Sequence, residues 1–474
     1  MGDKLIPTGN RADQILYRNS NLEKWSGITE KTYLKSRQKY WAGIELYDAP
    51  SIGTINNINI FIRFNDEPEF RQECTDYDDP FNKEDGPSIR HYFDEVSYGL
   101  LEVNTYHYPE CGSNALSYQD SYPRSYYRPY SITDTLGYLD CWDVNNETED
   151  GISCADSTRW GYIREHKLLK NAIESILDQI PPDLDIDGND DGYVDNVTFL
   201  VSGSPTGWSN LLWPHRWSLT YSYNETNNNS VYINNAIVEA YNLNLLSGNP
   251  SYFTIGVLCH EFSHSLGLPD LYHYVDSPAP TPVGGWDIME QTTDIPQYMS
   301  AWMKYRYANW LDCPLIELSG EYYIHPLQHQ DNSCYLIKSP YSENQHFVVE
   351  YRKQEGMYES NLPGDDDGLL VYRINLDINN NEIIDSLEVD ASWNHIIGGN
   401  ADGPPDEVYL YRPGGTYINN GNLMKAIFNL ETGRTKINDS SDPSAFLYEN
   451  EPGGLNIQNI GSAGDIIEFT YWDI

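Results

Sequence analysis

Long apolar runs and basic residues are both scarce in this chain. No apolar stretch approaches the roughly 18 consecutive residues of a membrane-spanning helix, so we expect no insertion into a membrane. Lys and Arg total 29 against 71 Asp and Glu, which gives a formal net charge of −42. A field of that sign repels nucleic acid, so we expect no nucleic-acid partner. Because the acidic residues are spread along the chain, many of them are candidate ligands for cations.

Cysteine is also uncommon, and its spacing excludes one kind of metal site. None of the seven cysteines forms a CxxC pair, so a zinc ribbon is not expected. Cys141 and Cys154 are close enough in sequence for a disulfide between them to close a short loop, although the pairing cannot be read from spacing. An odd total leaves at least one thiol outside any disulfide. Cys259 is expected to be a small buried residue and not a metal ligand.

The length and composition are those of a folded protein with more than one domain. The chain has 474 residues, of which 39% are hydrophobic and 13% aromatic, and a single core rarely serves so long a chain. Residues 1–50 are comparatively basic and are expected to be an N-terminal arm or the remnant of a prosegment. The sequence gives no indication of the oligomeric state.

Residues 51–312 alternate between strand and helix patterns. Residues 57–64 alternate apolar and polar positions, and residues 194–202 have the composition of a buried strand. Apolar residues at helical spacing predict a helix over 163–180, which Pro181 and Pro182 end. A second helix is predicted around 253–266. This alternation predicts an α/β domain.

Residues 313–474 have a different character. Short Tyr- and Val-rich runs alternate there with clusters of Gly, Pro, Asn and Asp, and no convincing amphipathic helix interrupts them. The runs are residues 321–324, 347–351, 369–374, 408–411 and 466–471. This pattern predicts an all-β, sandwich-like C-terminal domain.

The strongest functional signal is His260-Glu261-Phe262-Ser263-His264. On a helix, residues i and i+4 lie on one face, so both imidazoles can bind one cation. Zinc is the expected ion, because it lowers the pKa of a bound water to about 7 and polarises a carbonyl. Glu261 is placed to take a proton from that water and to give it to a leaving amine. The motif predicts zinc-dependent peptide-bond hydrolysis with Glu261 as general base and acid.

The residues after this motif offer a third ligand. Gly267 permits the left-handed conformation that ends a helix, and three residues later Asp270 can return to the metal with an oxygen ligand. The set of His260, His264 and Asp270 leaves a fourth position for water, as a catalytic zinc requires.

Other nearby side chains compete for the third position. Asp287 and Glu290 are the next carboxylates, and His273 is a further competitor. Met289 closes the run GGWDIM (284–289) about twenty residues after the motif. It could form an apolar floor beneath the metal.

The blocks HEFSHSLGLPDLY (260–272) and GGWDIM (284–289) closely resemble the immune inhibitor A family of secreted bacterial zinc metallopeptidases, which belong with the metzincin-like zincins. The resemblance extends over roughly residues 52–390. Its further blocks are IRHYFDEVSYGLLEV (89–103), LWPHRWSL (212–219), IPQYMSAWMKYRYANWLD (295–312) and FVVEYRKQEGMYESNLPGDDDGLLVYRI (347–374).

This resemblance implies a zinc endopeptidase that acts on protein or peptide substrates. It also implies an α/β zincin (metzincin-like) catalytic domain followed by a β-rich domain, with Met289 as the methionine of the Met-turn. The family is exported, whereas residues 1–4 carry no apolar signal segment. We therefore expect a secreted or cell-surface protein whose signal peptide has been removed, with a cytoplasmic protein as the alternative.

The group that stabilises the oxyanion stays open. Some metzincins have a Tyr two residues after the turn methionine, and Gln291 occupies that place here. Tyr298 is the nearest candidate, and core packing is the alternative role for it.

An acidic loop before the predicted strand at 194–202 resembles the first nine residues of an EF-hand loop. Oxygen side chains stand at positions 1, 3, 5 and 9, with Gly192 at position 6. These side chains are Asp187, Asn189, Asp191 and Asp195. Thr198 replaces the usual Glu at position 12, so Asp185 or Asp183 would supply the missing oxygen. We expect a structural calcium ion here, and a solvated acidic turn is the alternative.

A second run begins at Asp377 and ends with the acidic Glu388 at its twelfth position. Glu382 stands at the sixth position, where a sharp turn needs Gly. An ordinary Asn-rich turn is therefore expected for residues 377–388, and a second calcium loop is the alternative.

Two other functions compete with a zinc endopeptidase. The first is a non-catalytic, calcium-stabilised surface adhesin that retains a metal site, although such a site has no need of Glu261. The second is a zinc hydrolase that acts on something other than protein. The cleavage preference, the physiological substrate and the zymogen boundary cannot be read from the sequence.

Overall fold

The structure is a computed structural model that describes most of the chain from residue 49 onward. The described residues are 49–70, 74–110, 116–139, 141, 147–148, 151–203, 211–220, 230–246, 254–274, 279–377, 389–390, 395–396 and 398–473. Almost all of the predicted arm over 1–50 and most of the second candidate loop, 378–388, lie outside them. The chain divides into two compact units. The described residues of the first fall within Tyr47–His91 and Leu101–Ser265, and those of the second within Tyr92–Leu100 and Leu266–Ile474.

The first unit is built on a six-stranded, mostly parallel sheet. Its strands are β1 (Gly53–Arg63), β2 (Leu101–Tyr108), β3 (Tyr118–Gln119), β4 (Val197–Ser202), β5 (His215–Ser218) and β8 (Ala240–Leu246). Their order is β2-β1-β4-β8-β5, with β3 also pairing with β1. β5 pairs antiparallel with β8 at one edge, while the other pairs are parallel. β1 has partner strands on both edges and is also buried on both faces: Ile58, Ile60 and Ile62 are fully buried on one face, and Asn57 and Asn59 on the other.

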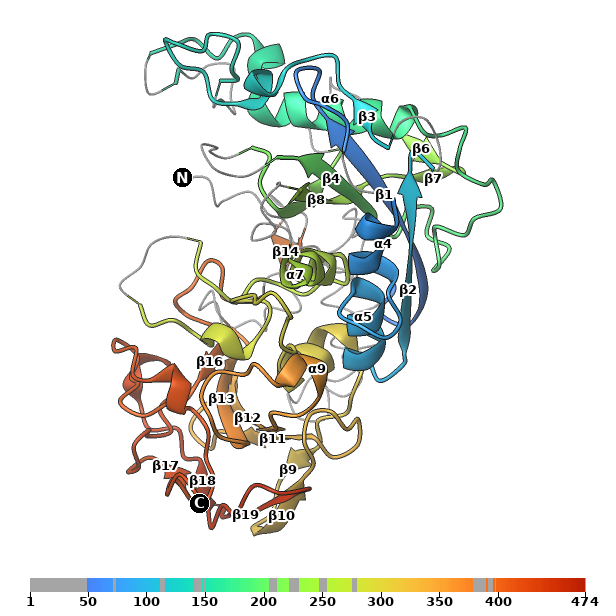
Figure 1. Ribbon diagram of the computed structural model, residues 1–474. Helices are drawn as coiled ribbons and strands as arrows, with labels where there is room; N and C mark the ends of the chain where they lie inside the picture. Colours follow the sequence, from blue (N-terminus) through green and yellow to red (C-terminus); the bar gives the residue numbers. More distant parts are fainter. Residues whose placement is uncertain are drawn as a thin grey trace. The chain divides into compact units, whose positions relative to one another are not determined.

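Two helices cover opposite faces of this sheet (Figure 1). Alternate residues of a strand point to opposite faces. Tyr241 of β8 shares a core with Leu168 of α6 (Gly161–Glu174). The next residue, Asn242, points the other way and donates to the main-chain oxygen of Glu261 in α7 (Ile255–Ser265), at 2.8 Å. Because Tyr241 and Asn242 are consecutive residues of β8, α6 packs on one face of the sheet and α7, which carries the metal-ligand motif, packs on the other.

Smaller elements complete this part of the chain. They are α4 (Cys74–Asn82), η1 (Arg124–Tyr127), η2 (Ser157–Arg159) and the hairpin of β6 (Tyr232–Ile233) with β7 (Ala236–Ile237). Helix α5 (Ile89–Val96) begins in the first unit and belongs to the second from Tyr92 onward.

The predicted helix over 163–180 is wrong at its C-terminal end. α6 ends at Glu174, and residues 175–180 form turns. The main-chain N–H of Ile176 bonds to the oxygen of Ile173 at 3.0 Å, three residues back, and the Ser175 hydroxyl donates to Ala172 at 2.7 Å. Ile176 and Ile180 are still buried. The turns therefore continue the apolar pattern that the sequence shows, without continuing the helix.

The second unit is rich in β structure. A five-stranded sheet has the order β16-β13-β12-β11-β9, and a four-stranded sheet has the order β10-β19-β18-β17. The strands of these two sheets are β9 (Leu315–Ile316), β10 (Gly320–Ile324), β11 (Cys334–Lys338), β12 (Gln345–Arg352), β13 (Gly368–Asn375), β16 (Val408–Leu410), β17 (Ile437–Asn438), β18 (Asn456–Gln458) and β19 (Ile467–Tyr471). β14 (Val389–Asp390) and β15 (His395–Ile396) form a separate antiparallel pair. Each of the five predicted runs after residue 313 falls on one of these strands.

Helices in the second unit are short. They are η4 (Gly284–Trp286), α8 (Ala301–Met303), the π-helical turn η5 (Lys304–Ala308), α9 (Gly356–Glu359), η7 (Leu423–Lys425) and η8 (Tyr448–Asn450). The two units together confirm the expected mixed α/β structure and the further β-rich region.

Two disulfides and one buried thiol account for the cysteines whose side chains are described. Cys141 bonds to Cys154, and Cys313 bonds to Cys334. Cys259 is a buried free cysteine, and burial raises the pKa of its thiol well above the ordinary value. Within the described part of the chain, no helix has the length and apolar character needed to cross a membrane.

Candidate metal centre

Helix α7 is fixed on the sheet by polar side chains at its C-terminal half. The main-chain oxygen of Glu261 accepts from Asn242, and the Ser265 hydroxyl donates to Asn196 Oδ1 at 2.7 Å. Asn196 immediately precedes β4, and Asn242 lies on the neighbouring strand β8. These contacts between adjacent strands and the helix set the rotation of α7, and with it the direction in which its imidazoles point.

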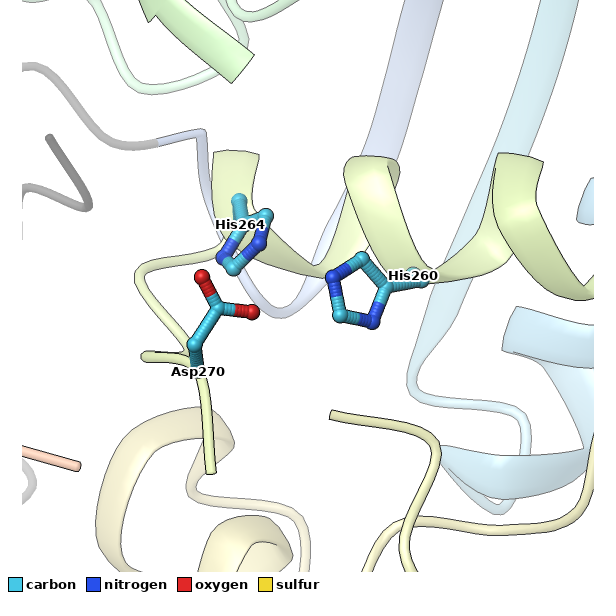
Figure 2. A group of neighbouring side chains, drawn as sticks. All are labelled: His260, His264 and Asp270. Carbon is cyan, nitrogen blue, oxygen red and sulfur yellow. The ribbon is translucent and has the colours of Figure 1, made fainter. Parts of the chain in front are cut away.

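The histidines of α7 lie next to Asp270, as Figure 2 shows. One ligand atom from each of His260, His264 and Asp270 can be chosen so that all three lie within 4.8 Å of one another. The two imidazole rings are 4.8 Å apart and nearly perpendicular, at 87°. The side chains are almost fully buried, with exposed fractions of 8%, 0% and 1%. Two imidazole nitrogens and one carboxylate oxygen are a donor set that suits zinc.

The chain between the histidines and Asp270 turns where the sequence predicts. α7 ends at Ser265, and Gly267 has a φ of +83°, the left-handed conformation that glycine adopts without strain. We call residues 266–274 the Asp270 loop. Its turn reverses the chain within three residues, which brings Asp270 beside His264 (Figure 2).

The Asp270 carboxylate is oriented by a tyrosine of its own loop. The Tyr274 hydroxyl donates to Asp270 Oδ2 at 2.6 Å. Burial, together with the Asp270 carboxylate, raises the pKa of Tyr274 well above its ordinary value, so the phenol stays protonated and can donate. A hydrogen bond of this kind to a metal-ligating carboxylate fixes its orientation. This role of Tyr274 was not predicted from the sequence, where the only local signal is its place four residues after Asp270.

Met289 lies within hydrogen-bond reach of the same loop. Its main-chain oxygen accepts from the N–H of Leu271 at 2.9 Å, and its side chain is fully buried. The Asp287 carboxylate accepts from the N–H groups of Met289 at 2.9 Å and Ser300 at 2.7 Å. Burial raises the pKa of Asp287 to about 6. The segment that carries Met289 is therefore fastened directly beside Asp270.

One comparison identifies the catalytic part of the chain. The family model for the immune inhibitor A peptidase M6 catalytic domain matches residues 58–311, more than half of the 474 residues. The chain belongs to the immune inhibitor A (M6) peptidase family. The predicted resemblance is thereby confirmed, and membership makes the chain a metallopeptidase whose substrates are proteins or peptides. No curated protein matches the chain.

In this M6 peptidase the competitors for the third ligand position have other partners. Glu290 accepts from the main-chain N–H groups of Val283 and Gly284, and burial raises its pKa to about 7. His273 Nε2 is 2.7 Å from Asp406 Oδ1. Among the residues that the structure describes, His260, His264 and Asp270 form the one group of three or more such side chains close enough to hold a metal ion.

The candidates for the oxyanion role remain unassigned. The Tyr298 side chain is 1% exposed, and its hydroxyl donates to Glu95 Oε1. The Gln291 main-chain oxygen accepts from the Gln297 amide at 2.5 Å. The buried Tyr298 hydroxyl is thus engaged with a carboxylate, and core packing stays the alternative role for this residue.

In the predicted calcium loop, the carboxylates accept hydrogen bonds from main-chain N–H groups of the same loop. Asp187 accepts from Asp191 at 2.9 Å and from Gly192 at 2.7 Å, and Asp195 Oδ2 accepts from Gly188 at 2.9 Å. Asp191 Oδ1 accepts from Tyr193 at 2.9 Å, and Asp185 Oδ1 from Asp187 at 3.3 Å. The amide of Asn189 is buried without a hydrogen-bond partner among the described residues. The loop carboxylates are not gathered as closely as the His260 group is, so calcium stays a prediction.

Proposed function

We propose that this M6 peptidase is a secreted zinc-dependent endopeptidase, with His260, His264 and Asp270 as zinc ligands and Glu261 as general base and acid. The observation that carries the proposal is the buried group of two imidazoles and one carboxylate, held by a helix and by the turn that follows it. Three protein ligands of this chemistry leave one coordination position for water or substrate, as catalytic zinc sites do.

Each residue of the group has a separate task in this proposal. The two histidines and Asp270 hold the ion, and Tyr274 orients the Asp270 carboxylate through its 2.6 Å hydrogen bond. When bound, zinc polarises the scissile carbonyl and lowers the pKa of a coordinated water. Glu261, 5% exposed and next to His260 on α7, would accept a proton from the attacking water and pass it to the leaving amine.

The finer description of the fold also belongs to the proposal. A metzincin-like catalytic domain over 51–312 is supported by the buried Met289 and its link to the Asp270 loop. A sandwich-like domain over 313–474 is supported by one core that combines residues of both sheets of the second unit. Val349 and Val371 contribute from the five-stranded sheet, and Ile457 and Phe469 from the four-stranded sheet. Side chains shared between two sheets are the mark of a sandwich.

Secretion is supported by the two disulfides, Cys141–Cys154 and Cys313–Cys334. Disulfides persist in oxidising surroundings and are rare in the cytosol. A zinc peptidase that acts outside the cell would meet its protein substrates there.

The decisive experiment removes proton transfer and leaves the ligands in place. Glu261→Gln keeps the size of the side chain but cannot accept a proton, so proteolysis of casein should fall by roughly 10²–10⁴-fold. Zinc content of the purified protein should stay at the wild-type level. Asp120→Asn is the matched control, because Asp120 is a buried carboxylate of the first unit that bonds to Tyr127 and Tyr122.

Two outcomes would contradict the proposal. Wild-type cleavage by Glu261→Gln would remove Glu261 from the mechanism. Absence of casein cleavage by the zinc-loaded wild type would favour the non-catalytic adhesin or a hydrolase with another substrate.

A further inference from the structure

The Asp270 loop is held by a segment that lies about 130 residues further along the chain, within the same unit. We call residues 398–408 the Asn400 segment. Two main-chain hydrogen bonds join the two: the N–H of Asn400 donates to the oxygen of Asp270 at 2.9 Å, and the N–H of Tyr274 donates to the oxygen of Ala401 at 2.8 Å. The first bond is made at the candidate ligand itself, and the second at the tyrosine that orients its carboxylate.

Side chains of the Asn400 segment add two further attachments. The fully buried Asn400 amide donates to the main-chain oxygens of Leu271 at 3.0 Å and Val408 at 2.9 Å, and its oxygen accepts from the N–H of Val408 at 3.0 Å. Asp406 pairs with His273 at 2.7 Å, where both side chains are nearly buried. A buried amide that uses both its donor group and its acceptor fixes two main chains relative to each other.

The approach of the two segments depends on a glycine. Gly399 has a φ of +76°, and a Cβ atom there would lie 2.5 Å from the main-chain oxygen of Asp270 and 2.7 Å from Pro269 Cβ. No larger residue fits without moving the Asp270 loop. Within the same segment, Glu407 accepts from Trp302 Nε1 at 2.7 Å and from the Tyr307 hydroxyl at 2.6 Å. These bonds attach the segment to α8 and η5 as well as to the Asp270 loop.

We propose that the Asn400 segment is a positioning element of the metal centre, required for the Asp270 loop to retain zinc. This inference rests on the proposed function, because it takes Asp270 as a zinc ligand. The family match ends at residue 311, so the residues proposed to position the metal centre lie in the β-rich region beyond that match. Partners behind metal ligands commonly contribute 10–100-fold to metal affinity.

Zinc affinity of the full-length protein, measured by competition with a zinc-binding dye, tests this inference. Asn400→Ala removes three hydrogen bonds of the segment, so it should weaken zinc binding by roughly tenfold or more. Gly399→Ala should do the same by steric displacement, although it removes no hydrogen-bonding group. The matched control is Asn429→Ala, which removes a buried amide that donates to Asp367 and accepts from Thr432, each at 2.6 Å. It should lower the melting temperature and leave zinc affinity unchanged.

The outcomes separate this inference from the proposed function. Wild-type zinc affinity in Asn400→Ala, or an equal loss in Asn429→Ala, overturns the positioning role. Asp270→Asn, measured alongside, should lose zinc in either case; if it does not, the proposed ligand set is wrong. If Asn400→Ala does not fold, Asp406→Ala, which breaks only the pair with His273, replaces it, and an unchanged zinc affinity there overturns the inference.

Discussion

Replacing Tyr274 by Phe is the smallest change that tests how the proposed metal centre is organised. The substitution removes one hydroxyl and keeps the ring in place. The lost contact is a 2.6 Å hydrogen bond from a neutral phenol to the Asp270 carboxylate. Hydrogen bonds to charged groups contribute about 1.5–3 kcal/mol, and 1.4 kcal/mol corresponds to a tenfold change in a binding constant. If the bond serves to orient the ligand, zinc affinity should fall roughly ten- to hundredfold.

A dye-competition titration near neutral pH would measure this change, since the raised pKa of Tyr274 keeps the hydroxyl protonated there. Tyr127→Phe is the matched control, because Tyr127 donates to the Asp120 carboxylate at 2.7 Å in the first unit. That variant should lose stability and keep its zinc affinity. Equal zinc affinity in Tyr274→Phe and the wild type would show that the phenol does not orient the ligand. An equal loss in both variants would show a general effect of destabilisation.

Three further predictions follow from the charged groups. Asp270→Asn should lose zinc far more readily than Asp287→Asn, and equal zinc occupancy would refute the choice of third ligand. Calcium should raise the melting temperature of the wild type, by an amount equivalent to about 2.7 kcal/mol at a hundredfold excess over its dissociation constant. Calcium should raise the melting temperature of the Asp187→Ala, Asp191→Ala double variant much less. An identical rise in both proteins would show that the loop is a solvated turn without calcium. Burial lowers the pKa of Lys304 to about 7. Above that pH the folded protein holds Lys304 neutral, and unfolding lets the side chain take up a proton. The wild type should therefore gain stability relative to Lys304→Met as pH rises from about 7 to about 9. A difference in unfolding free energy that does not change with pH would contradict it.

Local patterns in the sequence predicted most of the elements that carry the candidate site. The spacing of His260 and His264 needs only a helix to bring two imidazoles together, and Gly267 needs only its own backbone freedom to return Asp270. The strands after residue 313 were found because their apolar runs are short and bounded by turn residues.

The contacts that hold the site could not be predicted in this way. Asn400 reaches Asp270 and Leu271 across about 130 residues, and no local pattern distinguishes this asparagine from the others of an Asn-rich chain. The end of α6 was missed for a related reason. Hydrophobic periodicity records which residues are buried, and Ile176 is buried in a turn as completely as it would be in a helix.

The start of the first unit limits where a precursor of this protein could be cut. β1 lies inside the sheet between β2 and β4, and its loss would divide the sheet. Just before it, the buried Ala49 donates its main-chain N–H to the oxygen of Ser265 at 2.8 Å, at the residue that follows His264. A maturation cleavage that keeps this contact would therefore fall on the N-terminal side of Ala49. A cut between Ala49 and β1 would remove this hydrogen bond and leave the end of α7 held by Asn196 and Asn242, so even trimming by a few residues would weaken the support of the helix that carries both histidines.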